Sequence, residues 1–353
     1  MNPAFDEVLA AGSDAMLSAF DTTAQRLGTP AQNIEKDFWV CWTLDALFNG
    51  LKEGGPRLLF KGGTSLSKGF GLISRFSEDI DVTVFRDDIG EPASVEELEG
   101  LSGKKRKARL DAVKDACKAY IDGPLRAELT SILQARLKAT GMAAGAARVE
   151  ADETDPDGQT LLLWYPSATP RSDYVRAAIK IESGAKSALD PNSQMPIKPY
   201  VDDDLPTLDL TVPDVRTVDP ERTFWDKVVI LHGLRRWFDK RGELRGGGQR
   251  VSRHYYDLHR LAEASTGAAA IAEPALGADC VAHARMFFDR PDFDLKSAAP
   301  GTFALTPHDE MIEQLRADYR AMQGMIFGDP PQFEAVLDSI HALEKRLNGG
   351  KDD

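Results

Sequence analysis

The sequence has few cysteines and no long apolar run. Its three cysteines, Cys41, Cys117 and Cys280, lie far apart and form no Cys-x-x-Cys pair. This spacing indicates neither a zinc knuckle nor a disulfide framework. No apolar stretch approaches the roughly 18–20 residues that a membrane span needs, and the N-terminus lacks the basic start of a secretion signal. We therefore expect a globular protein of the reducing cytoplasm that has no membrane partner.

The sequence also lacks an excess of positive charge. Its formal net charge is −13, which argues against a protein that coats nucleic acid without specificity. Local basic clusters are nevertheless present at Lys104–Arg109 and within Arg235–Arg253. Such clusters are either solvated faces or places of RNA contact, and the sequence alone leaves both readings open.

Signatures of several enzyme classes are missing. There is no Gly-x-Ser-x-Gly elbow of a serine hydrolase, and no Gly-x-Gly-x-x-Gly follows a predicted strand. The double glycine at Gly62-Gly63 is not followed by the Lys-Ser/Thr pair of a phosphate-binding P-loop. Hydrolase, dinucleotide-binding and P-loop chemistry are therefore not indicated.

What the sequence does contain is an Asp-x-Asp pair close behind a glycine turn, in FKGGTSLSKGFGLISRFSEDIDVTVF (Phe60–Phe85). On a strand, Asp79 and Asp81 project from one face, about 6–7 Å apart. Ile80 and the valines that follow alternate with them and face a core. We expect both carboxylates in solvent. Carboxylate oxygens on a stiff support, with positions left for water and phosphate, suit Mg²⁺ or Mn²⁺.

The glycine turn is predicted to lie between a strand at Arg57–Phe60 and a helix at Thr64–Phe70. Glycines let a backbone approach phosphate closely, and the first N–H groups of a helix attract anions. The expected nucleotide-binding residues of this region are the glycines, two hydroxyls and three nearby cations, namely Lys61, Gly62, Gly63, Thr64, Ser65, Lys68 and Arg75. The alternative for each cation is an ordinary surface residue.

A second acidic strand is predicted at residues 174–184, YVRAAIKIESG. Apolar residues including Val175 and Ile179 occupy one face, and Lys180 and Glu182 occupy the other. If this strand neighbours the Asp-x-Asp strand, Glu182 joins the aspartates as a third metal ligand, and Lys180 faces the nucleotide. Glu182 is otherwise a surface acid.

The rest of the chain predicts an α+β protein. Thr29-Pro30 and Asp219-Pro220 each start a helix, and Asp155–Gly158 is the turn of a hairpin. Helical patterns dominate after the proline-rich crossing that ends near Pro220. We expect a mixed α/β catalytic domain with N-terminal helices at 1–215, and a mainly helical domain at 216–353 that contributes to the active site.

Two later residues are candidates for catalysis. Lys227 sits at the edge of the apolar stripe of the helix that follows Pro220, where its amine could reach a site or simply the surface. Asp257 lies in SRHYYDLHRL, a helix that is denser in polar aromatic residues than routine core packing requires.

These motifs together resemble those of the AbiEii-type nucleotidyltransferase toxins of type IV toxin–antitoxin and abortive-infection systems. The matching segments are FKGGTSLSKGF and RFSEDIDVTVF, then IKIES, ERTFWDKVVILH and SRHYYDL, with IEKDFWV upstream as the family's entry helix. The similarity covers roughly residues 30–265. It implies a DNA-polymerase-β-like nucleotidyltransferase fold, a mixed sheet flanked by helices, joined to an α-helical C-terminal region.

The resemblance also implies roles for individual residues. Gly63, Thr64 and Ser77 would help to hold the triphosphate, Asp79 and Asp81 would bind Mg²⁺, and Glu182 is similar to the third acid. Lys227 and Asp257 match the later catalytic lysine and acid.

The implied reaction is transfer of a nucleoside monophosphate from an NTP to RNA, with the tRNA 3′ end as the favoured acceptor and an antitoxin with a DNA-binding domain as partner. The alternatives are transfer to a protein side chain, or a nucleotide-binding regulator without turnover that partners an antitoxin.

Overall fold

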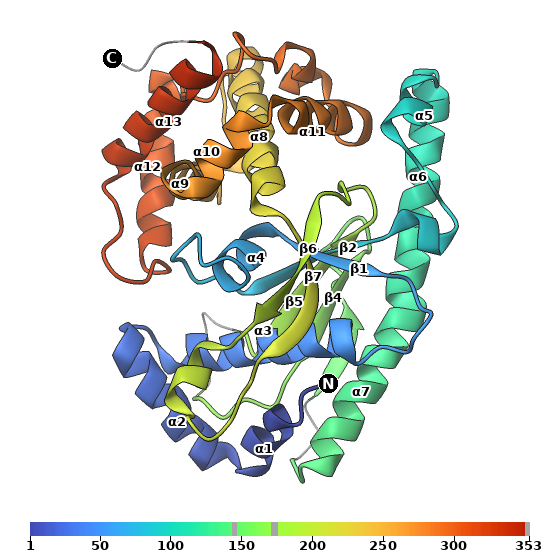
Figure 1. The fold of residues 1–353 in the computed structure, drawn as a ribbon, viewed down its shortest axis with the longest axis vertical. Coiled ribbons are helices and arrows are strands. Elements are labelled where there is room, and N and C mark those ends of the chain that lie inside the picture. Colours follow the sequence, from blue (N-terminus) through green and yellow to red (C-terminus); the bar gives the residue numbers. More distant parts are fainter. Residues whose placement is uncertain (143–146, 171–175, 350–353) are drawn as a thin grey trace. The chain divides into compact units, whose positions relative to one another are not determined.

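The computed structural model describes residues 1–142, 147–170 and 176–349, which form two compact units (Figure 1). The sheet unit comprises Met1–Gly69, Phe76–Ser94 and Leu101–Val218. The helical unit comprises Phe70–Arg75, Val95–Gly100 and Asp219–Asp353, of which 350–353 lie outside the described residues. Each unit is considered by itself.

In the described residues, the sheet unit is built on one mixed seven-stranded sheet, in the order β3-β4-β5-β2-β1-β7-β6. The strands are β1 (Leu58–Lys61), β2 (Asp79–Val84), β3 (Arg148–Ala151), β4 (Thr160–Trp164), β5 (Ala178–Gly184), β6 (Asn192–Ile197) and β7 (Val212–Val218). β2 lies centrally, antiparallel to β1 and parallel to β5. The predicted hairpin around Asp155–Gly158 is confirmed, because β3 and β4 pair antiparallel across it.

The helices of the sheet unit are α1 (Ala4–Ala10), α2 (Ser13–Leu27), α3 (Ala31–Asn49), α4 (Gly62–Lys68), α6 (Gly103–Tyr120) and α7 (Arg126–Ala139). Of these, α3, α4, α6 and α7 pack on this sheet, whereas α2 packs on α3 and α1 packs on α2 and α7 (Figure 1). α3 follows Pro30, as predicted, and packs against β2, β5 and β7. Every residue of α3 from Ile34 to Leu47 is buried, so this helix is the main support beneath the strands that carry the acids.

The helical unit is organised around α8 (Pro220–Arg241), which packs on α9 (Ser252–Glu263), α10 (Ser265–Ala272) and α11 (Pro274–Phe287). α12 (Asp309–Gln323) and α13 (Phe333–Leu347) contact α9, and the short α5 (Val95–Glu99) contacts α11. The predicted start of a helix at Asp219-Pro220 is confirmed. None of the helices in the described residues is long and apolar enough to cross a bilayer.

The α+β architecture is therefore as expected, with a mixed sheet flanked by helices and a helical C-terminal region. The sheet unit ends at Val218, close to the predicted domain boundary at residue 215. Two short segments were not anticipated in the helical unit, Phe70–Arg75 and Val95–Gly100. The first of them separates the glycine turn from the Asp-x-Asp strand in the sequence.

A buried histidine of the helical unit makes its stability depend on pH. The His232 ring is 0% exposed, and its Nδ1 accepts a hydrogen bond from the Ala304 N–H at 3.1 Å. Burial lowers the pKa of His232. The unfolded chain therefore binds more protons than the folded chain between the lowered pKa and the ordinary value near 6.5. The stability that the neutral, buried His232 gives the folded chain is intact above about pH 6.5, and it is lost as the pH falls below that value.

We expect unfolding free energy to fall between pH 6.5 and 5 by up to about 1.4 kcal/mol per pH unit from His232. Urea denaturation of wild type and His232→Gln at several pH values measures this difference. The variant should show a shallower decline than the wild type. Equal slopes in the two proteins would contradict the assignment.

Candidate active site

β2 presents its two aspartates on one face, as the alternation predicts. Ile80 and Val82 are fully buried, while Asp79 and Asp81 are half-buried. The expectation that both carboxylates lie in solvent is therefore wrong, because each aspartate is only partly exposed. Asp81 lies between neighbouring strands, and its side chain keeps 28% exposure. The strand still supports two carboxylates on a rigid base with an accessible side.

The glycine turn touches the Asp-x-Asp strand directly. β1 and β2 pair so that Lys61 lies opposite Asp81, and Gly62 follows with a φ of +81°. A Cβ built on Gly62 would come within 2.1 Å of the Asp81 Oδ2. Glycine is required at this position for two reasons, the left-handed backbone and the close approach of the carboxylate. The Lys61 ammonium lies 3.9 Å from the other oxygen of Asp81.

Gly62→Ala should therefore displace the Asp81 carboxylate, because the side chain can rotate whereas the backbone cannot. We expect the activity of this site to fall about 100-fold, since a misplaced reacting group costs that much. Gly54 is a matched control, because its φ is also +81° and nothing lies within 4 Å of its Cβ position.

Both alanine variants carry the left-handed backbone strain of about 1–2 kcal/mol. Only Gly62→Ala should lose activity beyond its loss of folded protein, measured as the initial rate per folded molecule. Equal rates in the two variants would show that the Asp81 contact does not matter.

The hydroxyls after the turn hold the turn itself. Thr64 and Ser65 are fully buried. The Thr64 hydroxyl lies 2.7 Å from that of Ser77 and also donates to the Asp79 carbonyl. The Ser65 hydroxyl donates to the Gly62 carbonyl at 2.8 Å. In this geometry Thr64 ties the first turn of α4 to the start of β2, and Gly62 and Gly63 before it are half-buried.

β5 brings the predicted third acid next to the pair. β2 and β5 run parallel, with Asp79 opposite Lys180 and Asp81 opposite Glu182. The two strands are therefore neighbours in the sheet, as predicted. Tyr174 and Val175, at the start of the predicted strand, lie outside the described residues. The Lys180 ammonium lies 2.6 Å from a Glu182 oxygen. Burial lowers the pKa of Lys180, but the Glu182 hydrogen bond and the charges of Glu182 and Asp79 outweigh it and raise the pKa.

The donor set suits a divalent cation that also binds phosphate. In the described residues no group of three or more His, Cys, Asp or Glu side chains is placed to hold a metal ion. Glu182 is adjacent to Asp81 in register but turns to Lys180. Mg²⁺ is usually bound by one or two carboxylates together with water and substrate phosphate. Asp79 and Asp81 meet that requirement, and Glu182 remains a predicted ligand.

Two of the expected phosphate-binding cations are buried in ion pairs, so neither is the surface residue considered as the alternative. The Lys68 side chain is 5% exposed, pairs with Asp37 of α3, and lies 3.3 Å above the Tyr200 ring. Arg75 belongs to the helical unit, where it pairs with Asp257. Because Lys68 and Arg75 are buried, Lys61 and Lys180, whose side chains are 30% and 34% exposed, are the better candidates for neutralising phosphate charge.

Lys227 and Asp257 meet in the helical unit as a buried cluster with Arg75. The Lys227 ammonium lies 2.8 Å from Asp257 Oδ2, and the Arg75 guanidinium donates to both Asp257 oxygens at 2.8 and 2.9 Å. Burial raises the pKa of Asp257, but the two cations outweigh it and hold the pKa far below the ordinary range. Burial lowers the pKa of Lys227 more than Asp257 raises it. Asp257 is therefore an ionised anchor for two cations.

The two basic clusters lie in different units. Lys104, Lys105 and Lys107 stand exposed on the first turns of α6 in the sheet unit, while Arg109 pairs with Glu91. The Arg235–Arg253 cluster belongs to the helical unit. Exposure is compatible with both readings of these clusters, RNA contact and a solvated face.

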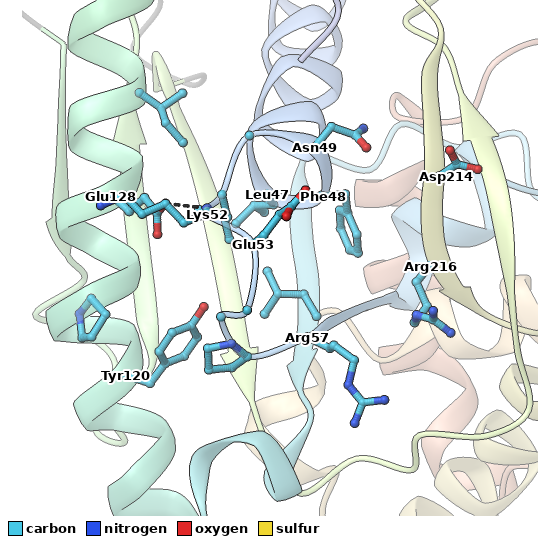
Figure 2. A pocket seen from close by; sticks show the side chains of 18 of the residues that line it. Leu47, Phe48, Asn49, Lys52, Glu53, Arg57, Tyr120, Glu128, Asp214 and Arg216 are labelled. Carbon is cyan, nitrogen blue, oxygen red and sulfur yellow. Dashed lines mark hydrogen bonds between the residues drawn. The ribbon is translucent and has the colours of Figure 1, made fainter.

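A cavity of about 1000 Å³ lies at the opposite end of β1, beside Leu58 rather than Lys61. Figure 2 shows that basic and acidic side chains both line it, among them Arg57, Arg216, Glu53 and Asp214. The Lys52 N–H donates to Glu128 across one side at 2.6 Å. None of the predicted site residues lines this cavity, so it is separate from the candidate active site.

Comparison with known proteins gives a match over most of the chain. The family model described as nucleotidyl transferase AbiEii toxin, type IV TA system, matches residues 45–339. No curated protein matches the sequence. Among solved structures, MenT4, a nucleotidyltransferase toxin from Mycobacterium tuberculosis, is similar at 16% identity and a TM-score of 0.47, over 95% of this chain and 91% of that one. A likeness of this degree carries no information on individual residues.

Proposed function

Because the chain belongs to the AbiEii family of nucleotidyltransferase toxins of type IV toxin–antitoxin systems, we propose that it transfers a nucleoside monophosphate from an NTP to RNA with the help of Mg²⁺. Family membership makes it a nucleotidyltransferase, with an NTP as substrate and an antitoxin as partner. The proposal adds the metal, the acceptor and the residues. The favoured acceptor is the 3′ end of tRNA, and the antitoxin is expected to carry a DNA-binding domain.

The observation that supports this most is the direct contact between the glycine turn and the Asp-x-Asp strand. Gly62 has no side chain, so the Asp81 carboxylate lies against the backbone that would bind phosphate. A metal held by Asp79 and Asp81 would then sit beside the triphosphate. A bound divalent metal would offset phosphate charge and lower the pKa of the attacking hydroxyl.

The protein's own groups have distinct tasks in this scheme. The backbone N–H groups after Gly62 and Gly63 would orient the triphosphate at the start of α4. Lys61 and Lys180 would offset its negative charge, and Lys180 also keeps Glu182 from repelling the aspartates. Thr64 and Ser77 act by fixing the turn to β2.

Lys227 and Asp257 are assigned from their match to the family's later motifs. We propose that Lys227 stabilises phosphate charge. Asp257 could either deprotonate the acceptor or hold Lys227 in place. Its very low pKa makes it a poor base, so positioning Lys227 and Arg75 is the better role.

Incubation with NTPs labelled at the α-phosphate, Mg²⁺ and total tRNA tests the proposal. Label in RNA is expected, at a level that falls to background in Asp81→Asn. Label in the protein fraction would indicate transfer to a side chain instead. No label in either fraction, with NTP still bound, would favour a regulator without turnover. An NTP labelled at the γ-phosphate is the matched control, because pyrophosphate leaves and no label should be transferred.

A further inference from the structure

Helix α3 contains three consecutive charged residues that are all buried. Glu35, Lys36 and Asp37 are 1%, 6% and 2% exposed, in a helix whose neighbouring side chains are mostly apolar and bulky. A buried charge is costly unless it is paired and hydrogen-bonded. Each of the three must therefore have a partner, and the partners show what this helix holds.

The two acids bind loops at different places of the sheet unit. Glu35 accepts hydrogen bonds from the Ala168 N–H and from the hydroxyl of Ser167, in the segment that precedes β5. Asp37 accepts from the Tyr200 N–H at 2.6 Å and pairs with Lys68 at the end of α4. α3 thus fixes chain segments next to two elements of the candidate site.

The lysine between them binds the start of the Asp-x-Asp strand. Its ammonium lies 2.5 Å from Oε2 of Glu78, the residue directly before Asp79. The Lys36 side chain is 7% exposed and that of Glu78 is 31% exposed, so the pair is partly shielded from water. A charge-assisted hydrogen bond in such a setting is strong and directional. The next residue, Asp79, is held by Thr64, which donates to the Asp79 carbonyl.

We propose that Lys36 is a positioning residue for the metal-binding pair, acting through Glu78 to fix the first residues of β2. The proposal rests on the function assigned to Asp79 and Asp81. Lys36 needs no contact with metal or nucleotide. Its effect arises because ligand groups must be held within about 0.5 Å of their working positions by a second layer of contacts. Without the Lys36 ammonium, Glu78 becomes an unpaired acid beside two others, and the strand end gains freedom.

Titration with Mn²⁺ in the absence of nucleotide, followed by electron paramagnetic resonance, tests this. We expect the Mn²⁺ dissociation constant to rise about tenfold in Lys36→Met and in Glu78→Gln. If Lys36 acts through Glu78, the double variant should bind no more weakly than either single one. Lys36→Arg, which keeps the charge, should restore most of the affinity. Glu78→Gln changes a partly exposed side chain, so it provides the test even if Lys36→Met does not fold.

Asp45→Asn is the matched control for lost stability. Asp45 is equally buried on α3 but accepts hydrogen bonds from Asn2 and Asn49, far from the acids along the helix. It should lower the melting temperature without changing the Mn²⁺ affinity. Unchanged affinity in Glu78→Gln, in a protein whose binding depends on Asp79, would overturn the role of Lys36 alone. If Mn²⁺ binding by the protein with Lys36 and Glu78 intact does not depend on Asp79, the proposed function is overturned, and the inference with it.

Discussion

Replacement of Asp79 or Asp81 by asparagine is expected to lower the rate of nucleotidyl transfer by about 10³-fold or more. Each substitution keeps the shape of the side chain but removes the negative charge that a hard cation requires. Stabilisation of transition-state charge by a metal is worth several kcal/mol, and each 1.4 kcal/mol is a factor of ten in rate. The initial rate of label transfer from an α-labelled NTP measures the effect.

Folding should be unaffected in these variants, because both carboxylates are half-buried and the buried face of β2 is unchanged. A suitable control is Glu150→Gln, which alters an acid of the same sheet that pairs with Arg148 on the edge strand β3. Its rate should match that of the wild type. Full activity in both aspartate variants would show that the metal assignment is wrong.

Asp257→Asn is expected to destabilise the helical unit by about 3–5 kcal/mol. Asp257 is completely buried between the Lys227 ammonium and the Arg75 guanidinium, and asparagine would remove the negative charge that these two buried cations share. Removing one partner of a buried pair is far more costly than removing the pair. Urea denaturation, followed through the tryptophan fluorescence of this unit, measures the loss.

Adding Lys227→Met to Asp257→Asn should recover part of the lost stability, because one of the two buried cations that Asp257 had balanced is then removed. Asp239→Asn is the matched surface control. Asp239 pairs with Arg235 and Arg236 at the exposed end of α8, where an ion pair contributes about 0–1 kcal/mol. A loss below 1 kcal/mol in Asp257→Asn would contradict the description of this cluster.

The local features of the site could be predicted from the sequence because they follow from short-range rules. Alternation of Asp79, Ile80, Asp81 and Val82 determines which side chains face the core, whatever the strand pairs with. Gly62-Gly63 between an apolar strand and a hydroxyl-rich segment likewise indicates that a helix follows the strand, although α4 begins at Gly62 rather than at the predicted Thr64. The register that sets Glu182 opposite Asp81 joins residues remote in sequence, and alternation alone does not determine it.

The buried ion pairs could not be predicted, for a related reason. Lys68 and Arg75 resemble surface cations in sequence, since their partners Asp37 and Asp257 lie in distant helices. A signal was nevertheless present in Glu35-Lys36-Asp37, because three charges placed directly before Phe38 and Trp39 on one helix cannot all reach solvent. The segment Phe70–Arg75, between the glycine turn and Asp79, belongs to the helical unit, which local sequence rules do not reveal.

The most direct test is a crystal structure with Mg²⁺ and an NTP analogue whose α–β bridge cannot be cleaved. We expect metal density in contact with the carboxylates of Asp79 and Asp81, and the triphosphate against the backbone of Gly62 and Gly63. A metal bound elsewhere, or a nucleotide bound away from this turn while the aspartates remain without a cation, would contradict the account.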